Sequence, residues 1–292
     1  MATAKSKPEL LVIVGATASG KSALAMKIAG NFDGEIISAD SWQVYKGFDI
    51  GTSKPNQTEQ KRVKHHLIDI REAQQGFNAP LFKELAEKAI ADIQNRGKLP
   101  ILTGGTGLYI DSLLYDFGFL PDVPAEQREI LNKLSISELL EKARAEGIDL
   151  AGIDTRNKRR IIRAIEAGGA RPTRSEMKKN TLIVGLRIDN DQLRRRVEQR
   201  VDKMLSAGLE KEVKNLADKY GWDIEPMKGI GYREWQAYFK GERSLEETKQ
   251  RVVSSTMNLA KRQRTWFKRN PDIHWFDSAE SAYSFVAGIL NT

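Results

Sequence analysis

The sequence contains no cysteine among its 292 residues. Disulfide bonds, cysteine-type zinc sites and thiol catalysis are therefore excluded. Long apolar runs are also missing, because no stretch approaches the roughly 20 residues that a helix needs to cross a bilayer. The opening segment, MATAKSKPELL, has too little hydrophobic length for a signal peptide. These absences predict a protein of the cytoplasm that makes no use of a membrane.

The residues that are present form an ordinary globular composition with an excess of positive charge. Apolar residues make up 40% and charged residues 29% of the chain, which is near the average for globular domains. The formal net charge is +8, so a polyanionic partner is expected. Two basic clusters carry much of this charge, at residues 156–163 and 261–269.

Short apolar runs that end in turn residues predict buried strands. They lie at 10–15, 35–40, 66–70, 100–105, 182–188 and 273–276. Helical patterns alternate with these runs, notably at 21–29 and 80–97, where apolar residues recur on one helix face. Alternation of strand and helix predicts an α/β fold with a doubly wound parallel sheet that helices cover on both sides.

The pattern changes between residues 116 and 180, where no strand of this kind is expected. Short helical segments separated by Pro, Gly and Asp are predicted there, at 124–134, 135–147 and 157–169. We interpret 116–180 as a small helical insertion domain within an α/β core made of 1–115 and 181–292. In the second part of the core, a long helix is predicted at about 190–219 and a basic helix at about 245–269.

The segment GATASGKS, residues 15–22, fits the phosphate-binding pattern G-x-x-x-x-G-K-[ST] completely. Glycines let backbone N–H groups turn toward a phosphate, Lys21 meets outer phosphate oxygens, and the hydroxyl of Ser22 can hold magnesium. The pattern does not choose between kinases, NTPases and enzymes that bind a diphosphate. The predicted phosphate-binding residues are Gly15, Ala16, Thr17, Ala18, Ser19, Gly20, Lys21 and Ser22.

Two further motifs end predicted strands, where the carboxyl ends of a parallel sheet line the ligand crevice. Asp40 could cap the following turn, bind magnesium or accept a proton, and a small-molecule kinase would show the same residue. GGTG at 104–107 is either a tight turn or a backbone approach to ligand, with the Thr106 hydroxyl as a donor. His65 and His66 lack partner acids or cysteines at metal-ligand spacing, so we interpret them as loop or packing residues.

Several motifs occur in a fixed order along the chain: GATASGKS, SADSWQVYKGFDIGTSKP, HHLIDI, ILTGGTGLY, RRIIRAIE, RVEQRVDKMLSAGLEKEV, GIGYRE and LAKRQRTWF. With them the chain resembles the tRNA dimethylallyltransferase family, in its bacterial form, from about residue 10 to 277. The most specific part is the segment Asp40–Pro55. The resemblance implies a P-loop NTPase-like core and transfer of a dimethylallyl group from dimethylallyl diphosphate to tRNA. The acceptor would be the exocyclic amine of the adenosine 3′-adjacent to the anticodon.

The resemblance also implies roles for individual residues. Asp40 would accept the proton of the amine, while Lys21 and Arg200 would meet the charge of the diphosphate leaving group. Thr106 would lie in the channel between the two substrates, and Mg²⁺, held by Ser22, would be the cofactor. Contacts with the anticodon stem-loop of tRNA would come from Asp40, Ser41, Trp42, Gln43, Arg128, Arg159, Arg160, Arg163, Gly231, Tyr232 and Arg233. We expect the protein to act as a monomer.

Alternative functions remain open from the sequence. An adenylate isopentenyltransferase would use a free nucleotide as acceptor, but a mononucleotide needs no extended basic surface such as the insertion and the basic helix. A P-loop small-molecule kinase would turn over ATP, and it would leave the Asp40–Pro55 segment without a role. A non-catalytic RNA-binding module would not need an intact phosphate loop.

Overall fold

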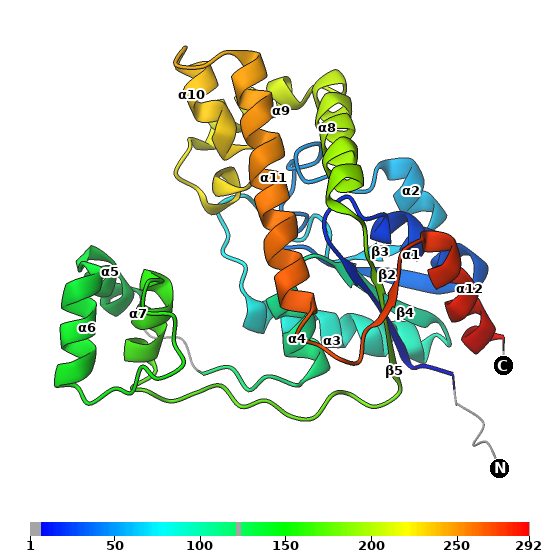
Figure 1. The fold of residues 1–292 in the computed structure, drawn as a ribbon, viewed down its shortest axis with the longest axis horizontal. Coiled ribbons are helices and arrows are strands. Elements are labelled where there is room, and N and C mark those ends of the chain that lie inside the picture. The colour runs from blue at the N-terminus through cyan, green and yellow to red at the C-terminus, as the bar shows by residue number, and fades with distance from the viewer. Residues whose placement is uncertain (1–6, 121–123, 292) are drawn as a thin grey trace. The chain divides into compact units, whose positions relative to one another are not determined.

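The computed structural model describes residues 7–120 and 124–291, and the chain divides into two compact units (Figure 1). The first unit combines Met1–Leu114 with Lys178–Thr292 and contains the sheet. The second unit is Tyr115–Met177, the part of the chain between them, and it is helical.

Within the described residues, the first unit is built on a sheet of six strands that are all parallel. The strands are β1 (Leu10–Gly15), β2 (Gly34–Ala39), β3 (His65–His66), β4 (Leu99–Gly104), β5 (Thr181–Leu186) and β6 (His274–Phe276). Their order across the sheet is β3-β2-β4-β1-β5-β6. Strand β1 thus lies in the interior of the sheet, between β4 and β5, and it runs in register with both. The predicted α/β fold of the P-loop NTPase-like type is confirmed.

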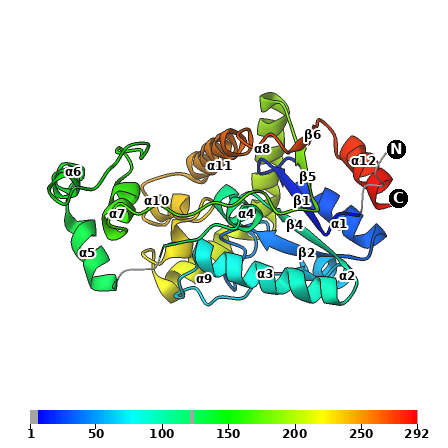
Figure 2. The ribbon, with the colours of Figure 1, turned by 90° about the horizontal axis from the view of Figure 1, so that it is seen from below.

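Helices cover both faces of this sheet. Helices α1 (Lys21–Asn31) and α12 (Ala279–Leu290) pack on one face, and α3 (Ala79–Asn95), α4 (Gly107–Leu114) and α11 (Leu245–Phe267) pack on the other (Figure 2). Among the described residues, no helix is long and apolar enough to cross a membrane.

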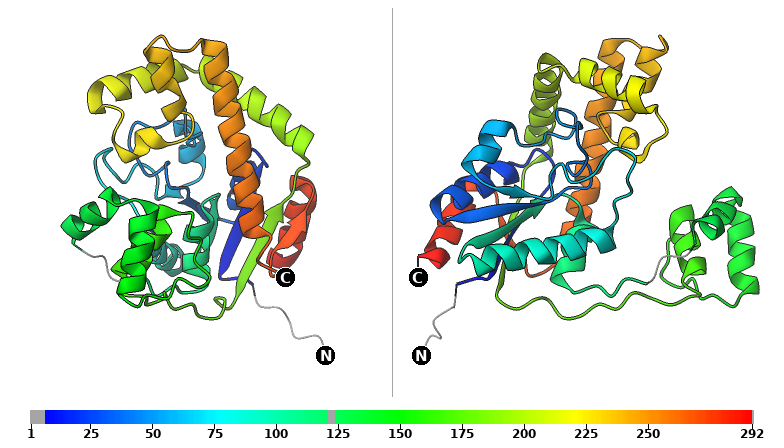
Figure 3. Two further views of the ribbon diagram at one scale, coloured as in Figure 1. Left: turned by 60° about the vertical axis from the view of Figure 1, so that its left-hand side comes forward. Right: turned by 180° about the vertical axis from the view of Figure 1, so that it is seen from behind.

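A further group of helices lies beyond the carboxyl ends of the strands (Figure 3). It contains α8 (Asn190–Ser206), α9 (Leu209–Tyr220), the 3₁₀ turns Glu225–Lys228 and Arg233–Trp235, α10 (Gln236–Phe239) and the first half of α11. Helices α8 and α11 share an apolar cluster that includes Val197 and Val252 and that also contains Ala16 and Ala18 of the phosphate loop. The core of this region is therefore continuous with the loop that begins at the end of β1.

Side-chain caps set where the long helices begin. Asn78 Oδ1 accepts a hydrogen bond from the backbone N–H of Leu81 and caps α3. Ser244 and Glu247 form a capping box at the start of α11. Such caps satisfy backbone N–H groups that have no partner inside the helix. The predicted helices at 80–97 and 245–269 are confirmed to within two residues at each end.

Two predicted elements differ from the structure. The expected strand at 66–70 is wrong beyond His66, because Leu67 and Asp69 have φ angles of +63° and +54°, which no strand accommodates. The expected helix at 190–219 is two helices, α8 and α9. Gly208, with a φ of +98°, ends the first and caps the second.

Four helices among the described residues of the first unit were not predicted from the sequence. They are α2 (Gln57–Arg62), α4, the four-residue α10 and α12. Helix α2 is only six residues long and has no buried residue, so it carries no apolar period. Helix α4 follows the GGTG turn directly, and most of its side chains are buried. A helix that is buried nearly all round gives no polar face by which to recognise it.

The second unit has an apolar core of its own. Helices α5 (Ala125–Lys133), α6 (Ile136–Ala145) and α7 (Lys158–Glu166) agree with the three predicted helical segments. The core residues are Leu131, Leu139, Ala143, Ile161, Ile162 and Ile165. Because the apolar side of α7 is buried there, its arginines at 159 and 160 remain exposed.

Glu35, in β2, is a buried carboxylate that cations surround. Arg96 donates to it through both terminal guanidinium nitrogens, and His66 Nε2 lies 2.7 Å from its Oε2. The Nζ atoms of Lys64 and Lys98 each lie 3.8 Å from the carboxylate. The hydrogen bonds from Arg96, more than the one from His66, hold the pKa of Glu35 at about 2, although burial acts in the opposite direction.

Replacing Glu35 by Gln should lower the free energy of unfolding by about 3 kcal/mol at pH 7, because it removes the anion from a buried cluster of cations. Since the pKa in the folded state lies below its usual 4.5, the carboxylate stabilises the fold above that pH. This contribution declines as the pH falls toward 2. Urea unfolding at neutral and acidic pH measures both effects.

The control for this prediction is Glu84→Gln. It removes the exposed partner of Lys88 on α3, and exposed pairs contribute little to stability. The unfolding midpoint of this variant should stay close to that of the wild type. An equal loss of stability in the two variants would show that the buried cluster around Glu35 has no special role.

Candidate active site

The loop that joins β1 to α1 has a backbone that only glycine allows at two positions. Gly15 and Gly20 have φ angles of +152° and +101°. A Cβ atom on Gly15 would lie 2.7 Å from Ser19 Oγ and 3.0 Å from the carbonyl oxygen of Leu186. The loop leads directly into the N-terminus of α1, where free backbone N–H groups and the helix dipole favour an anion.

Two side chains that were not predicted from the sequence hold this loop from other helices. Gln263, in α11, accepts a hydrogen bond from the Thr17 N–H at 2.8 Å and donates to the carbonyl oxygen of Gly105 at 3.1 Å. Arg196, in α8, donates to the carbonyl oxygen of Ser19 at 3.3 Å. Gln263 is buried, so it ties the phosphate loop firmly to the GGTG turn. In the sequence, Gln263 is distinguished only as an uncharged amide among the basic residues of LAKRQRTWF. The sequence does not indicate which residues it contacts.

Two cationic side chains meet the same loop. Lys21 Nζ donates to the carbonyl oxygen of Ala16 at 3.3 Å, and Arg200 Nη1 donates to Thr17 Oγ1 at 3.2 Å. Burial lowers the pKa of both groups. For Lys21 the nearby charge of Arg200 lowers the pKa further and Asp40 raises it, which leaves a pKa of about 8. Two partly desolvated cations at one loop favour an anionic ligand.

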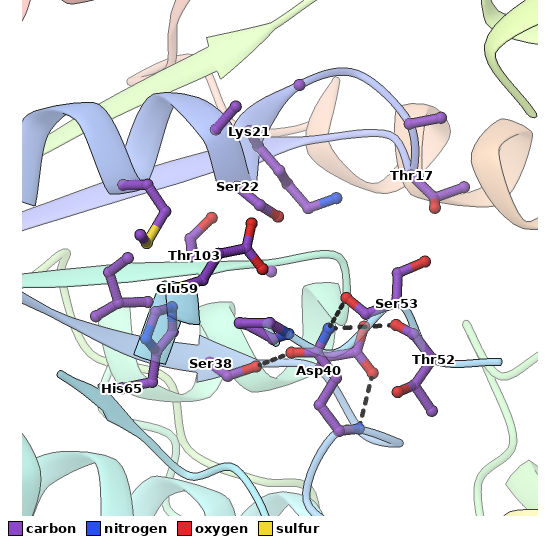
Figure 4. Close-up of a pocket in the computed structure, with 18 of the residues that line it drawn as sticks. Thr17, Lys21, Ser22, Ser38, Asp40, Thr52, Ser53, Glu59, His65 and Thr103 are labelled. Carbon is purple, nitrogen blue, oxygen red and sulfur yellow. Dashed lines mark hydrogen bonds between the residues drawn. The ribbon is translucent and has the colours of Figure 1, made fainter. Parts of the chain in front are cut away.

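Asp40 follows the last residue of β2 and faces the phosphate loop (Figure 4). Its Oδ1 accepts hydrogen bonds from the backbone N–H groups of Trp42, at 2.9 Å, and Gln43, at 3.4 Å. Oδ2 accepts no hydrogen bond from any residue in the described parts of the chain. The carboxylate therefore both caps the turn and keeps one oxygen available for a ligand.

Gln43 connects the turn after β2 to a second loop at the mouth of the site. Its Oε1 accepts a hydrogen bond from the hydroxyl of Ser38 at 2.9 Å, and its Nε2 donates to the carbonyl oxygens of Thr52 and Ser53, both at 3.3 Å. Figure 4 shows these bonds beside Asp40, with Lys21 and Ser22 on the opposite side of the pocket. Residues 52 and 53 are thereby placed across from the phosphate loop.

Thr106 lies at the end of the GGTG turn, close to Asp40 along the sheet edge. Its backbone N–H donates to the carbonyl oxygen of Ala39 at 3.2 Å, and its hydroxyl donates to Ser41 Oγ at 3.4 Å. A side chain on Gly104 would lie within 2.2 Å of the Ala39 carbonyl oxygen. The turn thus requires glycine to bring Thr106 next to the residues that follow Asp40.

Two cavities open on this site. The first, of about 840 Å³, contains Lys21, Ser22 and Gln43 in its lining, and the second, of about 210 Å³, contains Trp42 and Thr106. The residues that line both cavities are Thr17, Asp40, Thr52, Ser53 and Arg200. A ligand held by the phosphate loop and a second ligand near Thr106 could therefore meet at the carboxylate of Asp40.

The donors around the phosphate loop fit a metal ion that a phosphate chain helps to coordinate. Ser22 lines the first cavity together with Lys21. In the described ranges, no group of three or more His, Asp or Glu residues is placed to hold a metal. A divalent cation bound beside a phosphate chain would find the Ser22 hydroxyl among the available oxygen ligands, and Mg²⁺ commonly binds in such a place.

The residues predicted from GIGYRE do not all face the second cavity. Gly231 and Arg233 line it, as does Trp42, whose indole N–H donates to the Pro226 carbonyl oxygen at 3.0 Å. Tyr232 is fully buried. Its side chain can therefore contact no RNA unless the fold opens.

The predicted arginines of the second unit differ in their surroundings. Arg128 and Arg163 both form ion pairs with Glu166, and Arg163 also donates to the Leu120 carbonyl oxygen at 2.6 Å. Arg159 and Arg160 are exposed on α7. The first pair thus contributes to the packing of the second unit, whereas the exposed pair presents its charge to solvent.

The fold and the site together define a P-loop protein whose phosphate loop faces a carboxylate, and that carboxylate lines two neighbouring cavities. The model of the IPP transferase family matches residues 43–270, which is most of the chain. The protein belongs to this family.

Individual relatives agree with this assignment. A tRNA dimethylallyltransferase of Pediococcus pentosaceus is 44% identical over 285 residues, which cover 92% of this chain and 91% of the relative. The structure of a tRNA isopentenylpyrophosphate transferase from Bacillus halodurans superposes with a TM-score of 0.75 at 35% identity, and the match covers 98% of this chain and 97% of that one. The structure of a eukaryotic dimethylallyltransferase that is described as acting on tRNA superposes with a TM-score of 0.78 at 26% identity. The match covers 97% of this chain and 77% of that one.

Proposed function

We propose that this protein transfers a dimethylallyl group from dimethylallyl diphosphate to the exocyclic amine of the adenosine 3′-adjacent to the anticodon in tRNA. The observation that carries the proposal is the shared position of Asp40, which lines both the cavity at the phosphate loop and the cavity at Thr106. The names of the relatives agree with the same reaction.

The phosphate loop takes the donor. Backbone N–H groups of residues 15–22, with the side chains of Lys21 and Arg200, bind the diphosphate. Ser22 would hold a Mg²⁺ ion here, and the ion would supply further positive charge to the phosphate oxygens. As the bond between the allylic carbon and its oxygen breaks, negative charge grows on the diphosphate, and preorganised cations stabilise that charge. Diphosphate then leaves as the second product.

Asp40 acts on the acceptor. The lone pair of an adenine amine is delocalised into the ring, so the nitrogen becomes an adequate nucleophile only as its proton is removed. Asp40 Oδ2 is free to accept that proton while Oδ1 stays bonded to the turn. The new carbon–nitrogen bond forms as the carbon–oxygen bond breaks. Thr106, which lines the second cavity, is assigned to the channel between donor and acceptor. A base seated in the second cavity keeps water away from the allylic carbon.

The acceptor base must leave its stack to reach this cavity, as in other enzymes that modify a base. We assign Asp40, Ser41, Trp42 and Gln43 to the neighbourhood of that base, with Gly231 and Arg233 in the wall of the second cavity. Tyr232 supports this wall from inside the fold. The insertion arginines Arg128, Arg159, Arg160 and Arg163 bind the anticodon stem-loop. We further infer that the protein acts as a monomer in the cytoplasm.

The direct test is to incubate the protein with Mg²⁺, dimethylallyl diphosphate and unmodified tRNA, and to analyse the digested nucleosides by mass spectrometry. Prenylated adenosine from tRNA is the expected product. If AMP were prenylated and tRNA were not, the acceptor assignment would be wrong. If neither tRNA nor AMP were prenylated and the protein instead transferred phosphate from ATP to a small molecule, it would be a kinase.

Replacing Arg159 and Arg160 together by Ala should weaken tRNA binding and flatten its dependence on salt. For each phosphate that the variant no longer neutralises, the slope of log K against log salt should become shallower by about 0.7 to 0.9. Filter binding of tRNA at several salt concentrations measures this slope. A double replacement of Lys142 and Arg144 on α6 removes the same charge from the same unit and serves as control. An unchanged slope in the first variant would remove α7 from the tRNA site.

A further inference from the structure

The carboxylate of Glu212, in α9, accepts hydrogen bonds from two segments that are far apart in sequence. The backbone N–H groups of Asp49, Ile50 and Gly51 donate to it at 2.8 to 3.3 Å. The hydroxyl of Tyr232 donates to Oε1 at 2.8 Å. Three successive N–H groups and a phenol thus converge on one side chain, and burial together with the Glu212 charge raises the pKa of Tyr232 well above its usual value.

The two segments are in direct contact beside this carboxylate. A Cβ atom on Gly51 would lie 2.5 and 2.6 Å from ring atoms of Tyr232 and 2.7 Å from its hydroxyl oxygen. Gly231 has a φ of +94°, and a Cβ there would lie 3.2 Å from the Gly51 carbonyl oxygen. The ring of Phe48 meets that of Tyr232 edge-on, with centroids 5.0 Å apart. The segments therefore pack closely, with glycine on both sides of the contact.

Each segment continues into the lining of the active site. Thr52 and Ser53 follow the three N–H groups directly, and both line both cavities. Gly231 and Arg233, on either side of Tyr232, line the second cavity. Glu212 itself lines neither cavity. The Glu212 carboxylate therefore lies outside both cavities. It can affect the substrates only through the two segments that line them.

We propose that Glu212 is a positioning residue that sets the loop shared by the two cavities against the wall formed by Gly231 and Arg233. A carboxylate suits this place because it only accepts hydrogen bonds, and all four of its partners donate. The amide of a glutamine would turn an NH₂ group toward one or more of those donors. The loop would then shift or lose bonds, although the side chain has nearly the same shape.

A buried ammonium group holds the other side of the same loop. Lys54 Nζ donates to the Tyr45 carbonyl oxygen at 2.8 Å and to carboxylate oxygens of Asp49 and Asp69 at 2.5 and 2.6 Å. Residues 49–53 thus run between a buried ammonium group and the carboxylate of Glu212. This arrangement gives a physical reason for the pattern D-I-G-T-x-K in the most specific segment of the sequence.

The test compares Glu212→Gln with Glu210→Gln in the full-length protein. Glu210 lies on the same helix and accepts a hydrogen bond from the hydroxyl of Tyr238 at 3.0 Å, so it is a matched carboxylate and tyrosine pair that does not touch residues 49–51. Because this proposal rests on the proposed function, two readouts are needed. Steady-state transfer measures the reaction, and amide hydrogen exchange of the segment 49–53 measures the loop independently of activity.

For Glu212→Gln we expect kcat/KM to fall about 10- to 100-fold for donor and tRNA alike, which is the size of effect that a small misplacement of reacting groups produces. Both substrates should be affected because the loop lines both cavities. Exchange at 49–53 should become faster while the melting temperature changes little, and Glu210→Gln should match the wild type. Tyr232→Phe, which removes one donor, should change both readouts in the same direction by less.

The outcomes separate this proposal from the proposed function. If exchange at 49–53 stayed as slow as in the wild type, or if only the melting temperature fell, Glu212 would not position the loop. Faster exchange with unchanged kcat/KM would show that the loop position is not used by the reaction. If the wild type itself transferred no prenyl group, the proposed function would fail, and the exchange data would still decide the role of Glu212. If Glu212→Gln failed to fold, Tyr232→Phe would provide the same comparison.

Discussion

Asp40→Asn should lower kcat about 10²- to 10⁴-fold, because the amide cannot take the proton from the attacking amine. The hydrogen bonds of Asp40 allow this substitution to remove the proton acceptor without disturbing the turn. Asparagine keeps an oxygen in the place of Oδ1, so the hydrogen bonds from the N–H groups of Trp42 and Gln43 can persist. The affinities for tRNA and for the diphosphate donor should therefore stay close to those of the wild type. Single-turnover transfer with both substrates saturating measures the chemical step apart from binding.

The control for Asp40→Asn is Asp189→Asn. Asp189 caps α8 with Oδ1, which accepts hydrogen bonds from two backbone N–H groups much as Asp40 does, and it lines neither cavity. This variant should transfer the prenyl group at a nearly normal rate. If Asp40→Asn retained the wild-type rate, Asp40 would be a turn cap alone and another group would have to accept the proton.

Lys21→Ala should lower kcat/KM for dimethylallyl diphosphate about 10²- to 10³-fold, since it removes a cation aimed at the leaving group. Binding of tRNA in the absence of donor should change little. Lys27→Ala provides the comparison, because Lys27 lies on the same helix and lines the same cavity, but it is exposed and rests on the ring of Tyr283. An equally large effect of Lys27→Ala would show that general charge, and not the loop lysine, governs donor binding.

The lowered pKa of Lys21 adds a pH dependence to this prediction. Burial and Arg200 hold that pKa at about 8 in the free protein. Below this pH the amine is already charged, so it binds the diphosphate without taking up a proton. Above it, donor binding must take up a proton, so the donor Kd should rise up to about tenfold for each further pH unit. Calorimetric titration with the donor between pH 6 and 10 would show this increase in the wild type, whereas Lys21→Ala should bind weakly and without it.

The sheet could largely be predicted from the sequence because its strands are buried on both faces. Runs such as LLVIVG and PILTGG are continuous apolar segments that end in turn residues, and both are strands in the structure. The expected strand at 66–70 was wrong because the backbone turns to positive φ at Leu67 and Asp69. Nothing in the side chains of these two residues demands that conformation, since non-glycine residues rarely adopt it. In the structure, the backbone N–H groups of Asp69 and Ile70 donate to the carbonyl oxygens of Gln43 and Val44, partners that the sequence does not indicate.

The residues of the site also fall into two groups, those that could be predicted from the sequence and those that could not. The phosphate loop, Asp40 and Thr106 could be found because each belongs to a short contiguous motif at the end of a strand, and parallel strands bring their carboxyl ends together. The supports of the site could not be found. Gln263 reaches the phosphate loop from 246 positions away in the chain, and Glu212 meets residues 49–51 from about 160 positions away. A polar residue in a helix gives no indication of its partner before the helices pack.

By itself, the sequence determined the fold class, the phosphate loop and the carboxylate that faces it, because local motifs and apolar periodicity encode these features directly. Only the tertiary structure decided that two cavities share Asp40 and that Tyr232 is buried behind their wall. It also decided which arginines of the second unit pair with Glu166 and which remain exposed. The physical reason is that burial and hydrogen-bond partners depend on which surfaces meet, and those surfaces come from segments that are distant in the chain.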